Sequence, residues 1–330
     1  MAYFRTIPNI SKLLEQFSRD ESWLICINAD PDAMASALAL KRIMSRRVKD
    51  VAIAKVNELT RPDNLAMVRY CRIHMQTLTP ELVKKYDKFA LVDSQPSHHP
   101  SFESIPFSVI IDHHPLPEKE DAYAHVPYCS IIPSYGANVT ILIEHLYNLK
   151  IRPGKLLATA LQYAIKTDTK NFERHATDVD LRAFQYVNSM ADKTILYRIA
   201  RSEFHLDWLK YFATACTNVY TLKNGIFSFI GEVENSELVV NVADFFTRVY
   251  EANWVAVGAV HNDTVIVVFR SDGISKDVGK YAAELFGSIG SAGGHKTMAR
   301  AEFTVDHCGE QNPEIYIWRF FSHGRPNNSD

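Results

Sequence analysis

Cysteine is scarce in this sequence, and the few thiols present stand far apart. The 330 residues contain five cysteines and no Cys-x-x-Cys pair. Scattered thiols argue against a zinc knuckle and against a disulfide framework, because both need cysteines at short or regular spacings. We therefore expect a reducing compartment, that is, a cytoplasmic protein.

Long apolar runs and an excess of one charge are also missing. Residues 1–20 carry charges throughout, and no later run is long enough to span a bilayer, so we expect no signal peptide and no membrane partner. The formal net charge is −2. Because non-specific nucleic-acid binders are usually basic, any polyanion must be held by a local group of residues.

The chain does have the length and apolar content for two compact domains, with 47% hydrophobic residues. Short apolar runs alternate with helix-forming stretches in its first half. We expect strands at 23–28, 51–56, 89–92 and 109–111, and helices at 33–44, 136–149, 156–165 and from Thr177 to about 190. This alternation predicts an α/β fold with a parallel sheet covered by helices.

The order of expected strands and helices changes in the second half of the chain, and this change indicates a second domain. We predict a first domain over residues 1–195, a helical connector over 196–216 and a smaller α/β domain over 217–330. In the last of these we expect two strands within 219–230, a helix at 238–250, strands at 254–260 and 264–270, a helix at 275–286 and a glycine-rich loop.

Acidic residues and histidines stand where the expected elements of the first domain end. In chain order they are Asp30, Asp32, Asp93, Asp112, His113, His114 and Asp168. Each has an ordinary structural explanation, such as a turn at Asp-Pro-Asp or a helix cap. Ligands of open α/β sheets, however, bind outside the carboxyl ends of the strands, so the coincidence favours one shared site.

This combination of donors has a definite chemistry. Carboxylates with imidazoles suit a hard or borderline cation such as Mn²⁺, with Mg²⁺ as the alternative, whereas structural zinc prefers thiolates. Two such ions about 3.5–4 Å apart can clamp a phosphate, generate hydroxide from bound water and stabilise the leaving oxygen. The donors therefore predict metal-dependent hydrolysis of a phosphate ester.

A second group stands near the carboxyl end, where Gly293 and Gly294 precede His295, with Arg270 upstream. Closely spaced glycines let backbone N–H groups approach an anion, and the two basic side chains add positive charge. A tight connection is the plain alternative. We interpret the group as a binding site for a phosphate or a terminal nucleotide.

These segments resemble the motifs of the DHH phosphoesterases. The four motifs of the first domain read Ala29-Asp30-Pro31-Asp32-Ala33-Met34-Ala35-Ser36, Leu91-Val92-Asp93-Ser94, Ile111-Asp112-His113-His114-Pro115 and Ile165-Lys166-Thr167-Asp168-Thr169. Phe269-Arg270-Ser271 and Gly293-Gly294-His295 resemble the arginine and the substrate-holding loop of the DHH-associated carboxy-terminal domain. The resemblance covers nearly the whole chain, in family order.

The resemblance implies a role for each residue. Asp93 would lie between two ions, His114 would contact the phosphate, and Asp112 would orient a neighbouring histidine. The implied metal ligands are Asp30, Asp32, Asp93, His113 and Asp168, and the implied substrate-binding residues are Arg270, Gly293, Gly294 and His295.

Within the family, the chain is most similar to the bacterial nanoRNases, which degrade short oligonucleotides and dephosphorylate 3′-phosphoadenosine 5′-phosphate. The alternatives are a cyclic or linear dinucleotide phosphodiesterase, a pyrophosphatase or polyphosphatase, and a non-catalytic nucleotide-binding regulator. The sequence does not fix the oligomeric state, so a homodimer stays open.

One position departs from the pattern. The relatives usually carry a histidine ligand four residues before Asp30, and Cys26 stands there. If the strand continued to Asp30, alternation would place Cys26, Asn28 and Asp30 on one face, and sulfur or an amide oxygen could replace the imidazole. We favour a buried core cysteine together with a weakened site for the first ion.

Overall fold

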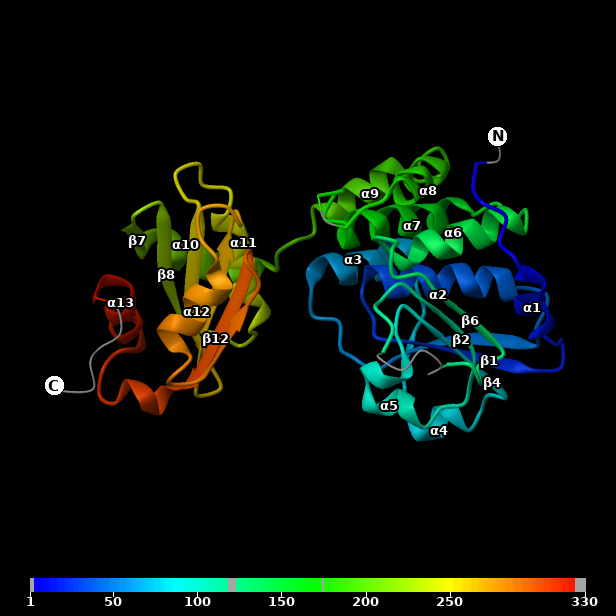
Figure 1. The fold of residues 1–330 in the computed structure, drawn as a ribbon, viewed down its shortest axis with the longest axis horizontal. Coiled ribbons are helices and arrows are strands. Elements are labelled where there is room, and N and C mark those ends of the chain that lie inside the picture. Colours follow the sequence, from blue (N-terminus) through cyan, green and yellow to red (C-terminus); the bar gives the residue numbers. More distant parts are fainter. Residues whose placement is uncertain (1–2, 118–122, 174, 324–330) are drawn as a thin grey trace. The chain divides into compact units, whose positions relative to one another are not determined.

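The computed structural model describes residues 3–117, 123–173 and 175–323 (Figure 1). The chain forms two compact units, Met1–Glu203 and Phe204–Asp330. The stretch expected to be one helical connector, 196–216, is divided between them: α9 (Lys193–Ala200) ends in the first unit and α10 (Leu209–Thr217) lies in the second. Helix α10 packs on a strand of its own unit, which is why no separate connector forms.

The first unit contains the predicted parallel sheet. Its six strands lie in the order β3-β2-β1-β4-β5-β6, and every neighbouring pair is parallel. Their bounds are β1 (Ser22–Ile27), β2 (Asp50–Lys55), β3 (Gln76–Thr77), β4 (Lys88–Val92), β5 (Phe107–Asp112) and β6 (Tyr128–Ile131). The sequence did not predict β3 and β6, because Gln76–Thr77 is polar and Tyr128–Ile131 contains a serine, so neither forms a run of aliphatic residues.

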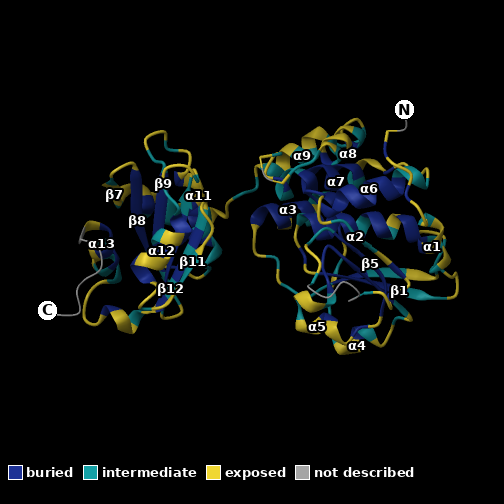
Figure 2. Cartoon of the chain, viewed as in Figure 1, coloured by how far each residue is buried: buried dark blue, intermediate teal, exposed yellow. Residues whose placement is uncertain are grey.

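Both faces of this sheet are buried, as expected for a parallel sheet (Figure 2). Trp23, Ile25 and Ile27 pack into one apolar core with α2 (Pro31–Met44), α6 (Asn138–Asn148) and α7 (Lys155–Asp168). Leu24 and Cys26 pack into a second core, on the opposite face. The short helices α4 (Pro80–Val83) and α5 (Pro100–Glu103) contribute to that second core.

The remaining helices of the first unit are α1 (Ile10–Glu15), α3 (Pro62–Cys71), the 3₁₀ turn η1 (Pro96–His98), α8 (Asp178–Asn188) and α9. Most of them begin at a proline or a capping side chain, whereas α1 has no side-chain cap. Thr177 caps α8 as predicted, because its Oγ1 accepts from Asp180 N at 3.4 Å and Asp180 Oδ2 accepts in return from Thr177 N at 2.8 Å. The Asp-Pro-Asp segment begins α2, where Asp30 Oδ1 accepts from Ala33 N at 2.8 Å and Pro31 occupies the first turn.

The second unit is also α/β, with a mixed sheet in the order β11-β12-β10-β9-β8-β7. Strands β8 and β9 are parallel and the other neighbours are antiparallel. Helices α10 and α11 (Glu237–Phe246) pack on one face, and α12 (Val278–Phe286) and α13 (Pro313–His323) on the other. The strands are β7 (Val219–Leu222), β8 (Gly225–Glu232), β9 (Trp254–His261), β10 (Thr264–Ser271), β11 (Ser291–Gly294) and β12 (Met298–Thr304).

The expectation of a glycine-rich loop after residue 286 is wrong, because this segment forms the antiparallel pair β11 and β12. Gly290 and Gly294 lie against neighbouring backbone atoms, whereas a Cβ at Gly293 would meet nothing within 4 Å. A Cβ at Gly279, in the first turn of α12, would lie 2.6 Å from Gly294 O. Gly294 itself has a φ of +149°, which side-chain-bearing residues rarely adopt. Clustered glycine therefore marks a tight contact between helix and strand here.

Among the described helices, none combines the length and the apolar character needed to cross a bilayer.

Candidate metal centre

The strand order reverses between β1 and β4, and this is where open α/β sheets bind their ligands. Asp30 and Asp32 follow β1, Asp93 follows β4, and β5, next in the sheet, ends at Asp112. The topology therefore gathers most of the predicted site at one edge of the sheet. Asp168 joins from another layer as the last residue of α7.

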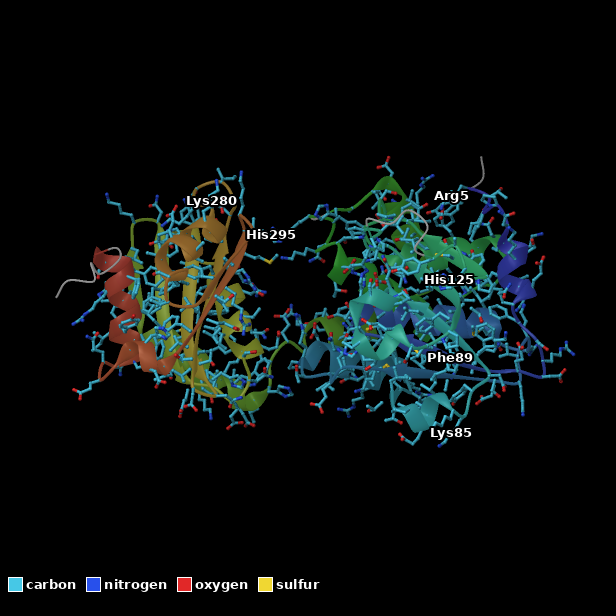
Figure 3. The ribbon with its side chains drawn as sticks, turned by 60° about the horizontal axis from the view of Figure 1, so that its bottom comes forward. Arg5, Lys85, Phe89, His125, Lys280 and His295 are labelled. Carbon is cyan, nitrogen blue, oxygen red and sulfur yellow. The ribbon has the colours of Figure 1, made fainter. Side chains whose placement is uncertain are left out.

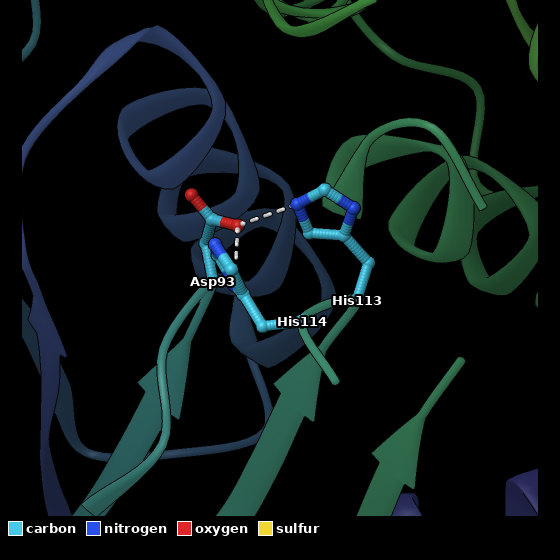
Figure 4. Close-up of side chains that lie close together, drawn as sticks. All are labelled: Asp93, His113 and His114. Atoms are coloured by element: carbon cyan, nitrogen blue, oxygen red, sulfur yellow. Dashed lines mark ion pairs between the residues drawn. The ribbon is translucent and has the colours of Figure 1, made fainter. Parts of the chain in front are cut away.

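The His113 ring points one nitrogen toward Asp93 (Figure 4), and its other nitrogen faces a backbone carbonyl group. Its Nδ1 lies 3.0 Å from Tyr135 O, and because a carbonyl oxygen has no proton to give, Nδ1 carries the hydrogen. Nε2 faces three carboxylates, 3.4 Å from Asp93 Oδ1, 3.5 Å from Asp168 Oδ2 and 4.0 Å from Asp32 Oδ2. In the neutral ring Nε2 presents a lone pair, so four electron-rich groups converge on a place that suits a cation.

Asp93 is buried and held in a conformation uncommon for aspartate. Its φ is +56°, and its backbone N–H donates to Ile111 O on β5 at 2.9 Å. Within the described part of the chain, no group donates a hydrogen bond to its Oδ1. Burial, together with the charges of Asp32 and Asp30, raises the pKa of Asp93 well above its usual range. A buried carboxylate oxygen without a donor is suited to bind a cation.

Asp32 is fixed by the start of α6. Its Oδ2 accepts from Asn138 N at 2.6 Å and its Oδ1 from Val139 N at 2.8 Å. Burial and the charges of Asp168 and Asp30 nevertheless raise the pKa of Asp32 well above its usual range. A bound cation would relieve this repulsion between carboxylates, so the donors present fit a metal.

Asp112 orients His114, as the sequence predicts for a neighbouring histidine. Its Oδ1 lies 2.8 Å from His114 Nδ1, and its Oδ2 accepts from Gln95 Nε2 at 2.7 Å. Burial alone would raise the pKa of Asp112, but the bonds from His114 and Gln95 outweigh it and lower that pKa. The bond to Asp112 in turn raises the pKa of His114. The pair therefore favours a carboxylate beside an imidazolium.

Gln95 is a residue that sequence reasoning missed. Its side chain is fully buried, and Nε2 also lies 3.1 Å from Pro115 O, while Oε1 accepts from Tyr123 O–H at 3.2 Å. Its backbone N–H donates to His98 Nδ1 at 3.2 Å. The only signal in the sequence was its position, since Gln95 stands two residues after Asp93, which follows β4.

Sequence reasoning also missed His98, which lies in the 3₁₀ turn η1 and not at the end of an expected strand. The His98 ring packs edge-on to the His114 ring, with centroids 5.4 Å apart. Three groups of potential ligands result among the described residues: Asp93, His113 and His114; Asp32, His113 and Asp168; and His98, Asp112 and His114. Asp30 belongs to none of these three groups, and its side chain caps α2.

Cys26 lies away from these groups. Strand β1 ends at Ile27, so the alternation that would have aligned Cys26 with Asp30 stops before Asp30. The Cys26 side chain is fully buried among apolar residues, including Leu24 and Phe89, and burial raises the pKa of its thiol to about 12. These observations support our interpretation of Cys26 as a core residue.

The predicted substrate-binding residues lie at one end of the second unit's sheet. Arg270 on β10 pairs with Met298 on β12, and His295 N donates to Met298 O at 2.7 Å. Arg270 Nε donates to Asp244 Oδ1 on α11 at 2.6 Å. His295, labelled in Figure 3, is exposed just beyond β11. Their roles in substrate binding stay predictions.

Comparisons with known proteins support this picture at the level of family and fold. Residues 23–165 match the DHH family, N-terminal domain. The chain is 31% identical over 280 residues to the uncharacterized protein MJ1633 of Methanocaldococcus jannaschii, a match that covers 84% of this chain and 57% of that protein. The chain thus spans little more than half the length of this relative.

Two solved structures match most of this chain. An exopolyphosphatase-related protein from Bacteroides fragilis superposes with a TM-score of 0.69 at 15% identity, over 94% of this chain and 93% of that one. A putative family II inorganic pyrophosphatase from Methanococcus jannaschii gives a TM-score of 0.47 at 14% identity, over 89% and 98%. At such identities, the first of these shows a shared fold and nothing finer.

Proposed function

We propose that this chain is a metal-dependent phosphoesterase with its ions at the carboxyl ends of β1, β4 and β5, and the match of residues 23–165 to the DHH family, N-terminal domain supports this proposal. The observation that carries the proposal is the convergence of His113 Nε2 with the oxygens of Asp93, Asp168 and Asp32. Buried groups of this kind repel one another unless a cation lies between them.

Asp93, His113, Asp32 and Asp168 would hold the metal, with Asp30 as a further ligand from the same helix start. Oxygen and imidazole donors favour Mn²⁺ or Mg²⁺. Bound there, the ions would polarise a phosphoryl oxygen and acidify a water molecule. Cys26 takes no part, because its thiol is buried in the opposite core.

His114 acts on the phosphate in this proposal. Its Nδ1–H donates to Asp112 Oδ1, which leaves Nε2 to carry the second proton of the imidazolium. The hydrogen bond to Asp112 raises the pKa of His114 and so favours the imidazolium, whose Nε2–H can donate a hydrogen bond to a phosphate oxygen. Gln95 holds Asp112 from the other side and thereby fixes the direction of the ring.

The proposed substrates are short oligonucleotides and 3′-phosphoadenosine 5′-phosphate. The motif resemblance supports this choice, and Arg270, Gly293, Gly294 and His295 are the proposed substrate-binding residues. A guanidinium has five N–H groups, of which Asp244 and Phe269 O accept one each. Arg270 therefore has further N–H groups with which it can bind a phosphate.

A substrate panel tests the proposal. Purified protein with added Mn²⁺ should hydrolyse di- to tetranucleotides and 3′-phosphoadenosine 5′-phosphate faster than longer strands. Cyclic dinucleotides, pyrophosphate and tripolyphosphate belong in the same panel. Turnover of pyrophosphate or a cyclic dinucleotide alone would retain the phosphate chemistry but overturn the substrate class. A protein that binds nucleotides and turns over nothing would be a non-catalytic regulator.

A further inference from the structure

The opposite end of α2 carries a second charged feature, of the other sign. A hollow of about 610 Å³ is lined by Arg19, Arg42, Ser45, Arg46, Arg47 and Ile151. Four of these six lining residues are arginines, and no carboxylate lines the hollow. Positive charge thus gathers at one place in a chain whose formal net charge is −2.

The arginines come from separate segments. Arg42 stands in the last turn of α2 and Arg46 just beyond it, whereas Arg19 precedes β1. Arg47 Nη1 donates to Ile43 O at 2.8 Å, which holds that side chain against the helix end. Within the described ranges, none of the four arginines forms an ion pair with a carboxylate. Their charges are therefore uncompensated by side chains.

The helix dipole explains only part of this arrangement. A basic residue in the last turn of a helix stabilises the exposed carbonyl groups, and Arg42 does so for α2. This effect falls off within one turn and gives no reason for Arg19 to join from a different segment. Like charges around one hollow repel each other, and a bound anion would relieve this repulsion.

The lining indicates which anion. Arginine presents a planar fork that matches two phosphate oxygens at once, which lysine cannot do. The hollow offers one aliphatic side chain, Ile151, and no aromatic ring among its lining residues, so a base would find nothing to stack on. The lining residues can therefore bind phosphate groups, and none of them is suited to bind a base.

We propose that this arginine pocket is a separate binding site for a compact ligand with two or more directly linked phosphates, either inorganic polyphosphate or the phosphate tail of a nucleotide. The metal centre lies at the other end of α2. The 14 residues of that helix span about 21 Å at 1.5 Å per residue. A ligand in the pocket is thus distinct from one at the metal ions.

Calorimetric titration of the full chain with tripolyphosphate tests this site, in buffer with a chelator so that no metal contributes. Arg42→Glu with Arg46→Glu should weaken binding about 10-fold or more, because two charge-assisted contacts are lost. The control, Lys41→Glu with Lys49→Glu, changes the net charge equally near the same helix end, outside the hollow, and should weaken it less than about threefold. If the glutamates prevent folding, Arg19→Gln with Arg42→Gln replaces them.

Two further ligands, ATP and a single-stranded oligonucleotide, test which chemical class the pocket binds. ATP should compete with tripolyphosphate and bind with a similar affinity, since the base makes no contact. Equal losses in the arginine and lysine variants would overturn the proposal, and so would binding that only Arg270→Ala abolishes. A single-stranded oligonucleotide that binds where tripolyphosphate does not would make the pocket a nucleic-acid surface, which also contradicts it.

Discussion

The charged groups of the two units are satisfied in different ways. At the carboxyl ends of β4 and β5, Asp93 Oδ1 has no donor among the described residues, and it faces the lone pair of His113. In the second unit, Arg270 already pairs with Asp244 at 2.6 Å. The carboxylates around Asp93 therefore need a bound cation to be stable in their charged form. Arg270 is already paired with a carboxylate and is stable without a ligand.

The largest effect should therefore come from the first unit. Asp93→Asn removes a ligand oxygen and a charge from the centre, and we expect turnover to fall by more than about 100-fold, since even residues behind metal ligands contribute about 10- to 100-fold. Arg270→Ala should mainly raise KM, because it removes binding made before the reaction. Steady-state kinetics of both variants measure this. An equal loss of kcat in both variants would contradict this difference between the two units and would give Arg270 a role in the chemical step.

Gln95 should rank next. Gln95→Leu removes the donor to Asp112 Oδ2 and releases the carboxylate that orients His114, so we expect kcat to fall by about 10- to 100-fold with little change in metal content. The control is Glu103→Gln, an exposed position on α5. A lower melting temperature at unchanged kcat would instead show that Gln95 only supports the fold.

A buried histidine with satisfied partners gives a contrasting prediction within the same unit. His145 Nδ1–H donates to Ile141 O at 2.7 Å, and its Nε2 accepts from Tyr128 O–H at 2.6 Å. Burial lowers the pKa of His145 to about 4. Its contribution to stability is therefore present above the unfolded pKa near 6.5 and is lost as the pH falls toward 4.

Between pH 8 and pH 5 this loss should amount to about 2 kcal/mol of the free energy of unfolding. Urea unfolding of the wild type and of His145→Gln at both pH values measures it. The variant should lose less stability than the wild type over this range. An equal loss in both proteins would assign the pH dependence to other groups.

The sequence predicted what depends on periodicity and order along the chain. The parallel sheet, the cap at Thr177 and the gathering of Asp32, Asp93 and His113 follow from alternation and from strand ends. Gln95 and His98 could not be found this way, because their roles depend on side-chain direction after a turn. The glycines near Gly294 were misread for a similar reason, since tight packing and a loop favour the same residue.

The most direct test is the metal content of the purified chain. After exposure to Mn²⁺ and removal of free ions, elemental analysis should find about two ions per wild-type chain, as in two-metal sites, or one if the first site is weak. Asp93→Asn should lose the metal while remaining folded, because the substitution removes a buried charge, and Cys26→Ser should retain it. A wild type without bound metal, or an Asp93→Asn variant that keeps all of it, would contradict the account.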